Sequence, residues 1–146
     1  MSFSIGLVLA LLSAGIAALV KFDGRTFYAT VLIAIASYYA LFAVMAGSMR
    51  AVMLESLIMT VFIALAVVGF RRSSLVLALG LCAHGVLDLV HGRILTNPGV
   101  PEWWPSFCMA YDVAVALALI AFRTRAAAPN LPFGLPADLT STSGLP

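Results

Sequence analysis

The sequence predicts an all-α, polytopic membrane protein with about five transmembrane helices in one bundle. Hydrophobic residues make up 63% of the 146 residues and charged residues only 10%, whereas soluble domains carry about a quarter charged residues. The mean hydropathy is +1.10. The apolar residues form five continuous runs, each close to the roughly 20 residues that cross a bilayer as a helix. Continuous runs favour helices over the short alternating strands of a membrane barrel.

Short polar breaks separate the five runs. The first run has no positively charged segment before it, so we predict a retained helix and not a cleaved signal peptide. Polar turns containing Lys, Arg, Asp and Ser follow the first three runs, and a loop rich in Pro, Gly and Trp follows the fourth. The predicted helices are residues 3–20, 27–47, 51–70, 75–91 and 107–122.

Two regions of different composition follow from this pattern. Residues 1–125 are predicted to form the transmembrane helical bundle. Residues 126–146 contain several prolines among polar residues, a composition typical of a flexible tail. The net charge of +2 is too small to indicate a nucleic-acid partner. The expected surroundings are the lipid bilayer, with a homo-oligomer or a larger membrane complex as further possibilities.

The basic residues predict the orientation of the bundle. An odd number of helices places the two termini on opposite sides of the membrane. The side of the N-terminus carries Arg50 and Arg93, and positively charged residues are enriched on the cytoplasmic side of membrane proteins. We therefore predict a multi-pass protein of the bacterial inner membrane with the N-terminus outside and the tail in the cytoplasm. The predicted cytoplasmic side carries Lys21, Arg25, Arg71, Arg72, Arg123 and Arg125.

Ionisable residues gather on the last two helices. His84, Asp88 and His91 follow one another at helical spacing, within an arc of about 60° on one face. Cys108 and Asp112 are likewise four residues apart on the next helix. If these two helices form an antiparallel hairpin, Asp88 lies level with about Asp112 and His84 lies one turn deeper.

The third helix adds one acidic residue to this layer. Counting back through the polar turn at residues 71–74 places Glu55 at the same depth as the end of the fourth helix. A charged Asp near the centre of a membrane costs about 2.5–3.5 kcal/mol on insertion scales, so such residues usually have a function. The predicted metal site consists of His84, Asp88, His91, Cys108, Asp112 and Glu55.

This set of side chains favours a divalent transition metal. Imidazole, carboxylate and thiolate ligands are typical of Zn, Cu or Fe sites. The HxxxDxxH spacing is moderately specific, and the absence of ExxH pairs from the sequence argues against a standard di-iron centre. Two alternatives stay open: a metal-free polar pocket or proton relay, and polar contacts between helices, worth about 0.6 kcal/mol each.

The loop between the last two predicted helices contains two adjacent tryptophans. Trp103 and Trp104 lie between Pro101 and Pro105, and tryptophan is enriched at the membrane interface. We predict an interfacial anchor there, with a lid over the polar site as the alternative. The prolines restrict the preceding residues to extended shapes, which predicts a rigid turn.

The order of these motifs resembles a family of small bacterial integral membrane proteins of uncharacterised function. The resemblance rests on HxxxDxxH at residues 84–91, the prolines Pro98 and Pro101 in the loop, and CxxxD at residues 108–112. It covers roughly the last two helices. It implies a shared multi-helix membrane fold and a shared polar site, and it implies no particular activity.

The residues predict a metal-binding membrane enzyme or redox protein that acts on a lipid or another apolar substrate from the outward side. One alternative is a metal or proton transporter or sensor, in which the same side chains would serve as way-stations. The other is a small accessory subunit of a larger membrane complex.

Overall fold

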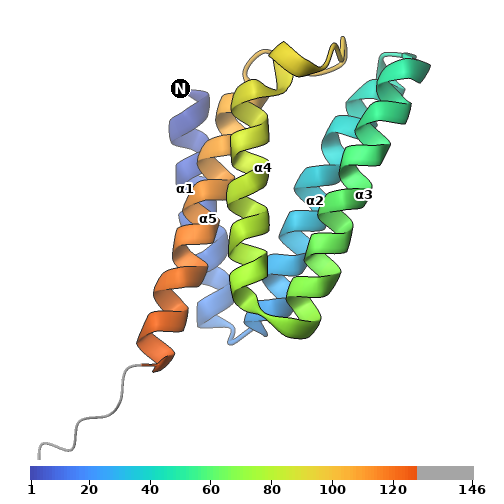
Figure 1. The fold of residues 1–146 in the computed structure, drawn as a ribbon. Helices are drawn as coiled ribbons and strands as arrows, with labels where there is room; N and C mark the ends of the chain where they lie inside the picture. The colour runs from blue at the N-terminus through green and yellow to red at the C-terminus, as the bar shows by residue number, and fades with distance from the viewer. Residues whose placement is uncertain (128–146) are drawn as a thin grey trace, which may run out of the picture.

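The computed structural model describes residues 1–127, which form five α-helices (Figure 1). Each helix is long and apolar enough to cross a membrane. The all-α, five-helix fold class predicted from the sequence is therefore confirmed. The helices are α1 (Ser2–Leu19), α2 (Gly24–Met45), α3 (Met49–Arg72), α4 (Ser74–Ile94) and α5 (Trp104–Ala127).

The helix ends differ slightly from the predicted ones. Helix α4 continues to Ile94 and α5 begins at Trp104, so both extend into the predicted loop. Pro105 is compatible with this early start, because a proline in the first turn of a helix removes no intrahelical hydrogen bond. The first two residues of the predicted tail belong to α5, and the rest of it, residues 128–146, lies outside the described residues.

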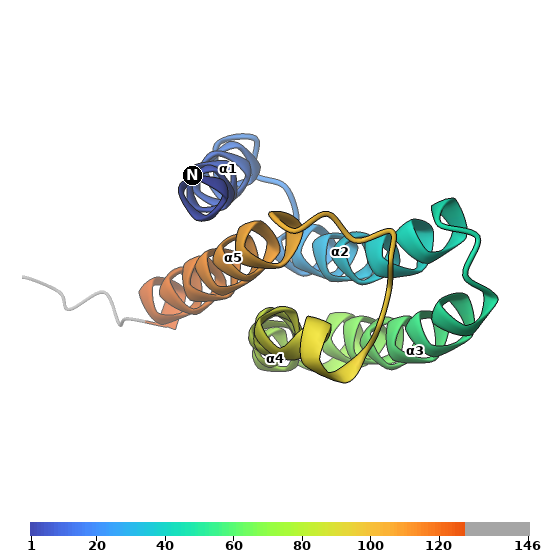
Figure 2. The ribbon, with the colours of Figure 1, turned by 90° about the horizontal axis from the view of Figure 1, so that it is seen from above.

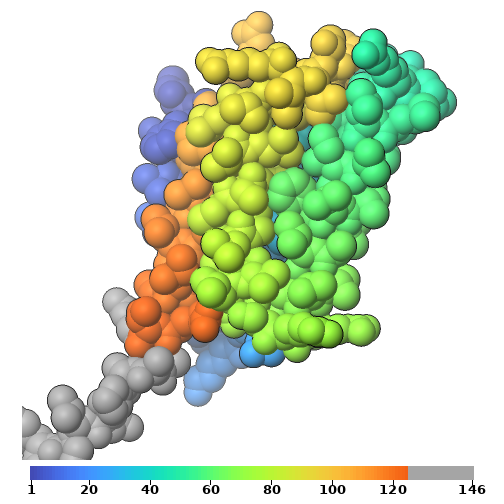
Figure 3. Space-filling view, viewed as in Figure 1, coloured from blue at the N-terminus to red at the C-terminus, as the bar shows by residue number. Residues whose placement is uncertain are grey.

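Four of the helices form a two-by-two bundle, seen from above in Figure 2. Helices α2 and α3 pack against each other, α4 packs against α5, and α3 packs against α4. Helix α1 lies on the outer side of α5 and makes nearly all its contacts there. In the space-filling view, α4 lies between α5 and α3 and forms the middle of that face (Figure 3).

Small and polar side chains bring α1 close to α5. A Cβ atom on Gly6 would clash with the backbone carbonyl of Phe107, so only glycine permits this approach. The hydroxyls of Ser13 and Tyr111 lie 3.0 Å apart and form a hydrogen bond between the two helices. Small residues at such crossings are the usual means of close helix packing in membranes.

Polar caps explain where the helices begin. The Asp23 carboxylate accepts hydrogen bonds from the Thr26 hydroxyl at 2.6 Å and the Thr26 amide at 2.9 Å, which lower the pKa of Asp23. Ser48 and Ser73 accept amide hydrogen bonds at the starts of α3 and α4. These side chains satisfy amides that the first helical turn leaves free.

The interior of the bundle divides into an apolar half and a polar half. The apolar half lies toward the α1–α2 and α3–α4 turns and contains the fully buried Leu32, Leu77 and Leu81. The polar half lies toward the N-terminus and the α4–α5 loop. Within residues 1–127, it contains all the buried acidic and histidine side chains, namely Glu55, His84, Asp88, His91 and Asp112.

Candidate metal centre

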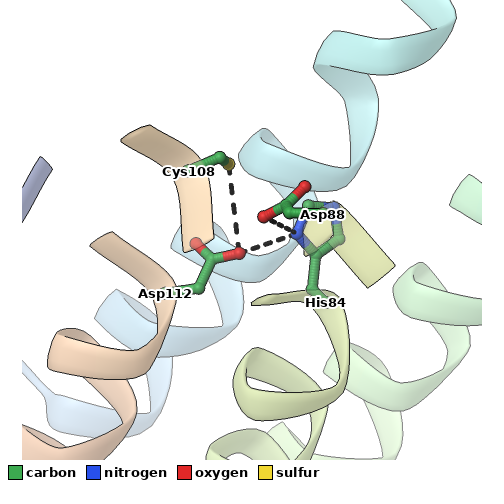
Figure 4. A group of neighbouring side chains, drawn as sticks. All are labelled: His84, Asp88, Cys108 and Asp112. Atoms are coloured by element: carbon green, nitrogen blue, oxygen red, sulfur yellow. Dashed lines mark hydrogen bonds and ion pairs between the residues drawn. The ribbon is translucent and has the colours of Figure 1, made fainter. Parts of the chain in front are cut away.

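Four of the six predicted ligands meet between α4 and α5. His84 and Asp88 project from α4, and Cys108 and Asp112 project toward them from α5 (Figure 4). One ligand atom from each residue lies within 4.8 Å of the other three, and all four side chains are buried. We refer to these four residues as the central group. The central group could hold a metal ion.

The His84 ring lies between two carboxylates. Its Nδ1 atom is 2.7 Å from Asp112 Oδ2 and 3.6 Å from Asp88 Oδ2. The Cys108 thiol donates to Asp112 Oδ2 at the longer distance of 3.9 Å. Because both distances start from one atom, His84 Nδ1 is directed toward both carboxylates.

The packing of α4 on α5 sets which residues meet. A Cβ atom added to Gly85 would lie 3.2 Å from Val113 and 3.4 Å from the Asp112 side chain, so this glycine marks the close approach of the two helices. As a result His84 is the direct partner of Asp112. Counting through the hairpin predicted Asp88 beside Asp112 and His84 one turn deeper, whereas the structure makes His84 the nearer partner of Asp112.

Two carboxylate oxygens of the central group are buried without a hydrogen bond from any described residue. They are Asp88 Oδ2 and Asp112 Oδ1. Such buried acceptors are costly unless a donor or a cation satisfies them. The central group places two carboxyl groups beside a single imidazole. A divalent cation would balance the charge of both groups in their ionised form and would bind the two unpartnered oxygens.

Tyr39 on α2 is a neighbour of the central group that lies outside the predicted metal site. Its hydroxyl donates to Asp88 Oδ1 at 2.6 Å, and its ring stacks on His91 with centroids 4.1 Å apart. The available signal was helical phase: Tyr39 follows the buried Leu32 and Ile35 on the inward face of α2. Tyr38, next in sequence, is 40% exposed.

The remaining two predicted ligands form a separate pair one turn nearer the loop. His91 Nε2 lies 2.8 Å from Glu55 Oε1, and both side chains are buried. Asn97 donates to the same Glu55 oxygen and to the backbone carbonyl of Tyr39, both at 2.9 Å. We call Glu55, His91 and Asn97 the latch. The structure thus separates Glu55 and His91 from the compact group of four.

The latch holds the α4–α5 loop over α2 and α3. Figure 2 shows the loop passing above these helices before it returns to α5. Gly99 lies directly on the carbonyl of Phe42, where a Cβ atom would clash. Trp104 packs between Tyr38 and Phe42 with ring centroids 4.9 Å from each, whereas Trp103 is 54% exposed. The loop is therefore fixed to the helices around the central group.

The spacing of the central group is compatible with one metal ion. Ligand atoms bound tetrahedrally at about 2.0–2.3 Å from an ion lie roughly 3.3–3.8 Å from one another. The ligand atoms of the central group lie between 2.7 Å and 4.8 Å apart. Small side-chain adjustments, of about an ångström, would therefore convert the hydrogen-bonded group into a coordination sphere.

Comparisons with protein-family models, with curated proteins and with solved structures find no match to this chain. The resemblance of the last two helices to a family of small bacterial membrane proteins therefore stays a prediction.

Proposed function

We propose that this protein is a metal-dependent membrane enzyme or redox protein, with one divalent transition metal bound by His84, Asp88, Cys108 and Asp112. The observation that carries the proposal is the convergence of four buried ligand atoms within 4.8 Å. Ionisable groups are expensive to bury in a membrane protein and usually mark a site of function. Two carboxylate oxygens of the same group that have no hydrogen-bond partner among the described residues support cation binding.

The ligand types favour zinc first, with copper or iron as the other choices. Zinc binds histidine, carboxylate and cysteine in tetrahedral sites. A single thiolate with imidazole is also suited to copper, whereas imidazole with carboxylates is suited to iron. Zinc would support hydrolysis or Lewis-acid chemistry, and copper or iron would support electron transfer.

A specific contact chain favours a proton relay as the second candidate. The Tyr39 hydroxyl lies 2.6 Å from Asp88, Asp88 lies 3.6 Å from His84, and His84 lies 2.7 Å from Asp112. Chains of acids and histidines carry protons in pumps and transporters. This function needs no metal, so metal binding distinguishes the two candidates.

Cobalt substitution tests the proposal directly. Metal-free protein in detergent is titrated with Co²⁺, whose absorption reports tetrahedral coordination and a bound thiolate. We expect visible d–d bands that saturate at one equivalent, together with a thiolate-to-cobalt charge-transfer band. The Cys108→Ser variant should lose the charge-transfer band and keep the d–d bands. The matched variant Cys82→Ser changes the other, non-converging cysteine and should keep both.

Wild-type protein that shows neither Co²⁺ absorption bands nor a thermal shift with Zn²⁺ would overturn the proposed metal site. A charge-transfer band that survives in Cys108→Ser would instead remove Cys108 from the ligand set.

The Tyr39→Phe variant is expected to bind Zn²⁺ about 10–100-fold more weakly than wild type, the usual effect of losing a partner that orients a metal ligand. The reason is the lost hydrogen bond to Asp88 Oδ1. Competition with a chelator of known affinity measures the change. The matched variant Tyr38→Phe removes a hydroxyl from the neighbouring, more exposed residue and should bind normally. Equal affinities in all three proteins would show that Tyr39 does not position Asp88.

A further inference from the structure

A cavity of about 340 Å³ lies between α2 and α5 and shares one residue with the central group. Its volume is near the lower end of the roughly 300–1,000 Å³ typical of small-molecule sites. The walls are predominantly apolar and aromatic. We call this cavity the α2–α5 groove; it is lined by Val31, Ala34, Ile35, Tyr38, Trp104, Phe107, Cys108 and Tyr111.

The groove follows the helices from the level of the tryptophan pair toward the middle of the bundle. On α5 its lining residues run from Trp104 to Tyr111, a rise of roughly 10 Å at 1.5 Å per residue. That is about a third of the hydrocarbon thickness of a bilayer. Tryptophan marks the membrane interface, so the groove begins near the headgroup level and descends among the acyl chains.

Cys108 connects the groove to the central group. It lines the groove, and its thiol also contacts Asp112 Oδ2. It lies one helical turn below Trp104, which is roughly 6 Å deeper. A chain lying in the groove would therefore have the carbon atoms nearest its headgroup beside Cys108.

Trp104, at the upper end of the groove, carries a polar atom without a partner in the described part of the chain. The Trp104 indole Nε1 is buried and has no acceptor among residues 1–127. A buried indole N–H normally has an acceptor. A rotation of the Trp104 side chain that turns this N–H into the groove would let it donate to the carbonyl oxygen of an acyl ester, at the depth where lipid esters lie.

We propose that the α2–α5 groove binds one acyl chain of a membrane glycerolipid, with an ester oxygen near Trp104 and the first chain carbons beside Cys108. One part of this proposal rests on the proposed function, namely that the bound lipid belongs to the apolar substrate class of the metal site. Acyl-chain binding itself depends only on the groove.

Photolabelling in vesicles tests the proposal. The full chain is reconstituted in phosphatidylcholine that contains a small fraction of phosphatidylcholine with a diazirine near the ester end of one acyl chain. After irradiation, adducts are mapped by peptide mass spectrometry. We expect the adducts to concentrate on the groove residues of α2 and α5 rather than spread over all the lipid-facing helix surfaces.

The variant Ala34→Phe fills the groove. Ala34 is exposed in the isolated bundle, so a larger side chain there enters the groove without disturbing the buried core. Labelling of the segment from Trp104 to Tyr111 should fall several-fold. The matched variant Val61→Phe adds a ring to α3, on an exposed position outside the groove, and should leave the labelling unchanged.

The outcomes separate the two proposals. Adducts spread evenly over the helices, or groove labelling that Ala34→Phe does not reduce, would overturn the acyl-chain site. An unlabelled groove in a protein that crosslinks as a dimer would also overturn it, because a second copy would then cover the groove. Bound metal is measured on the same samples. Labelling that Ala34→Phe reduces, in a protein that holds no metal, would refute the proposed metal function and retain the acyl-chain site.

Discussion

Replacing His84 with alanine is expected to abolish stoichiometric metal binding, with a loss of affinity greater than the roughly 100-fold that an outer-shell partner can cost. His84 Nδ1 is the only nitrogen ligand in the central group and lies 2.7 and 3.6 Å from the two carboxylates. Its removal leaves Asp88 and Asp112 facing each other without an imidazole. Zn²⁺ bound per chain after gel filtration measures the effect.

The losses should also be strongly non-additive. Once one ligand is gone the site no longer forms, so His84→Ala combined with Asp112→Ala should bind little worse than either single variant. The matched control is His91→Gln, which changes the other histidine of α4 while keeping a hydrogen-bonding partner for Glu55. It should retain one equivalent of metal. Full binding by His84→Ala, or loss of binding by His91→Gln, would contradict the assigned ligand set.

The Glu55→Ala variant is expected to lose about 3–5 kcal/mol of unfolding free energy, the range found when one partner of a buried ion pair is removed. Glu55 is paired with His91 at 2.8 Å and accepts from Asn97 at 2.9 Å. Alanine leaves the buried His91 without its partner and leaves Asn97 only the Tyr39 carbonyl as an acceptor. Thermal unfolding in detergent should therefore begin at a markedly lower temperature.

Two further variants test whether Glu55 holds the α4–α5 loop in place or binds the metal. Glu102→Ala removes an exposed acid from the same loop and should leave the unfolding temperature unchanged. Glu55→Gln keeps an acceptor for Asn97 and should retain both the fold and one equivalent of metal. A folded Glu55→Gln protein without metal would show that Glu55 is a ligand after all.

Composition and helical periodicity were sufficient to predict the five helices and the face of α4 that carries His84 and Asp88. Both depend on local properties: the length of the apolar runs and the spacing of 3.6 residues per turn. The sequence also predicted that Cys108 and Asp112 lie beside that face, because a short connection makes neighbouring helices antiparallel.

The division of the predicted ligands into two clusters could not be predicted in the same way. Periodicity places Asp88 and His91 on one face, but it does not determine the rotation or the height of α3 and α5 against that face. A turn of helix is about 5.4 Å, enough to exchange one partner for another. The register of α4 on α5 depends on contacts such as Gly85 against Asp112, whereas the packing of α4 on α3 pairs His91 with Glu55.

The contacts of Tyr39 and Asn97 could not be predicted for a different reason. The Tyr39 hydroxyl reaches Asp88 across the bundle, and the Asn97 amide reaches both α2 and α3 from the loop. Neither residue has a sequence neighbour that indicates its partner. Such long-range hydrogen bonds depend on the path of the α4–α5 loop. The proline and glycine content predicts that this loop is rigid, but it does not predict which helices the loop crosses.

The metal content of the wild-type protein tests the central claim most directly. The protein is purified from membranes in detergent without added metal, and a portion is stripped with chelator and reloaded. Elemental analysis is expected to find one equivalent of zinc, copper or iron per chain in the reloaded protein, together with a higher unfolding temperature than in the stripped protein. No metal above the detergent blank, and no thermal shift with any of the three ions, would contradict the claim.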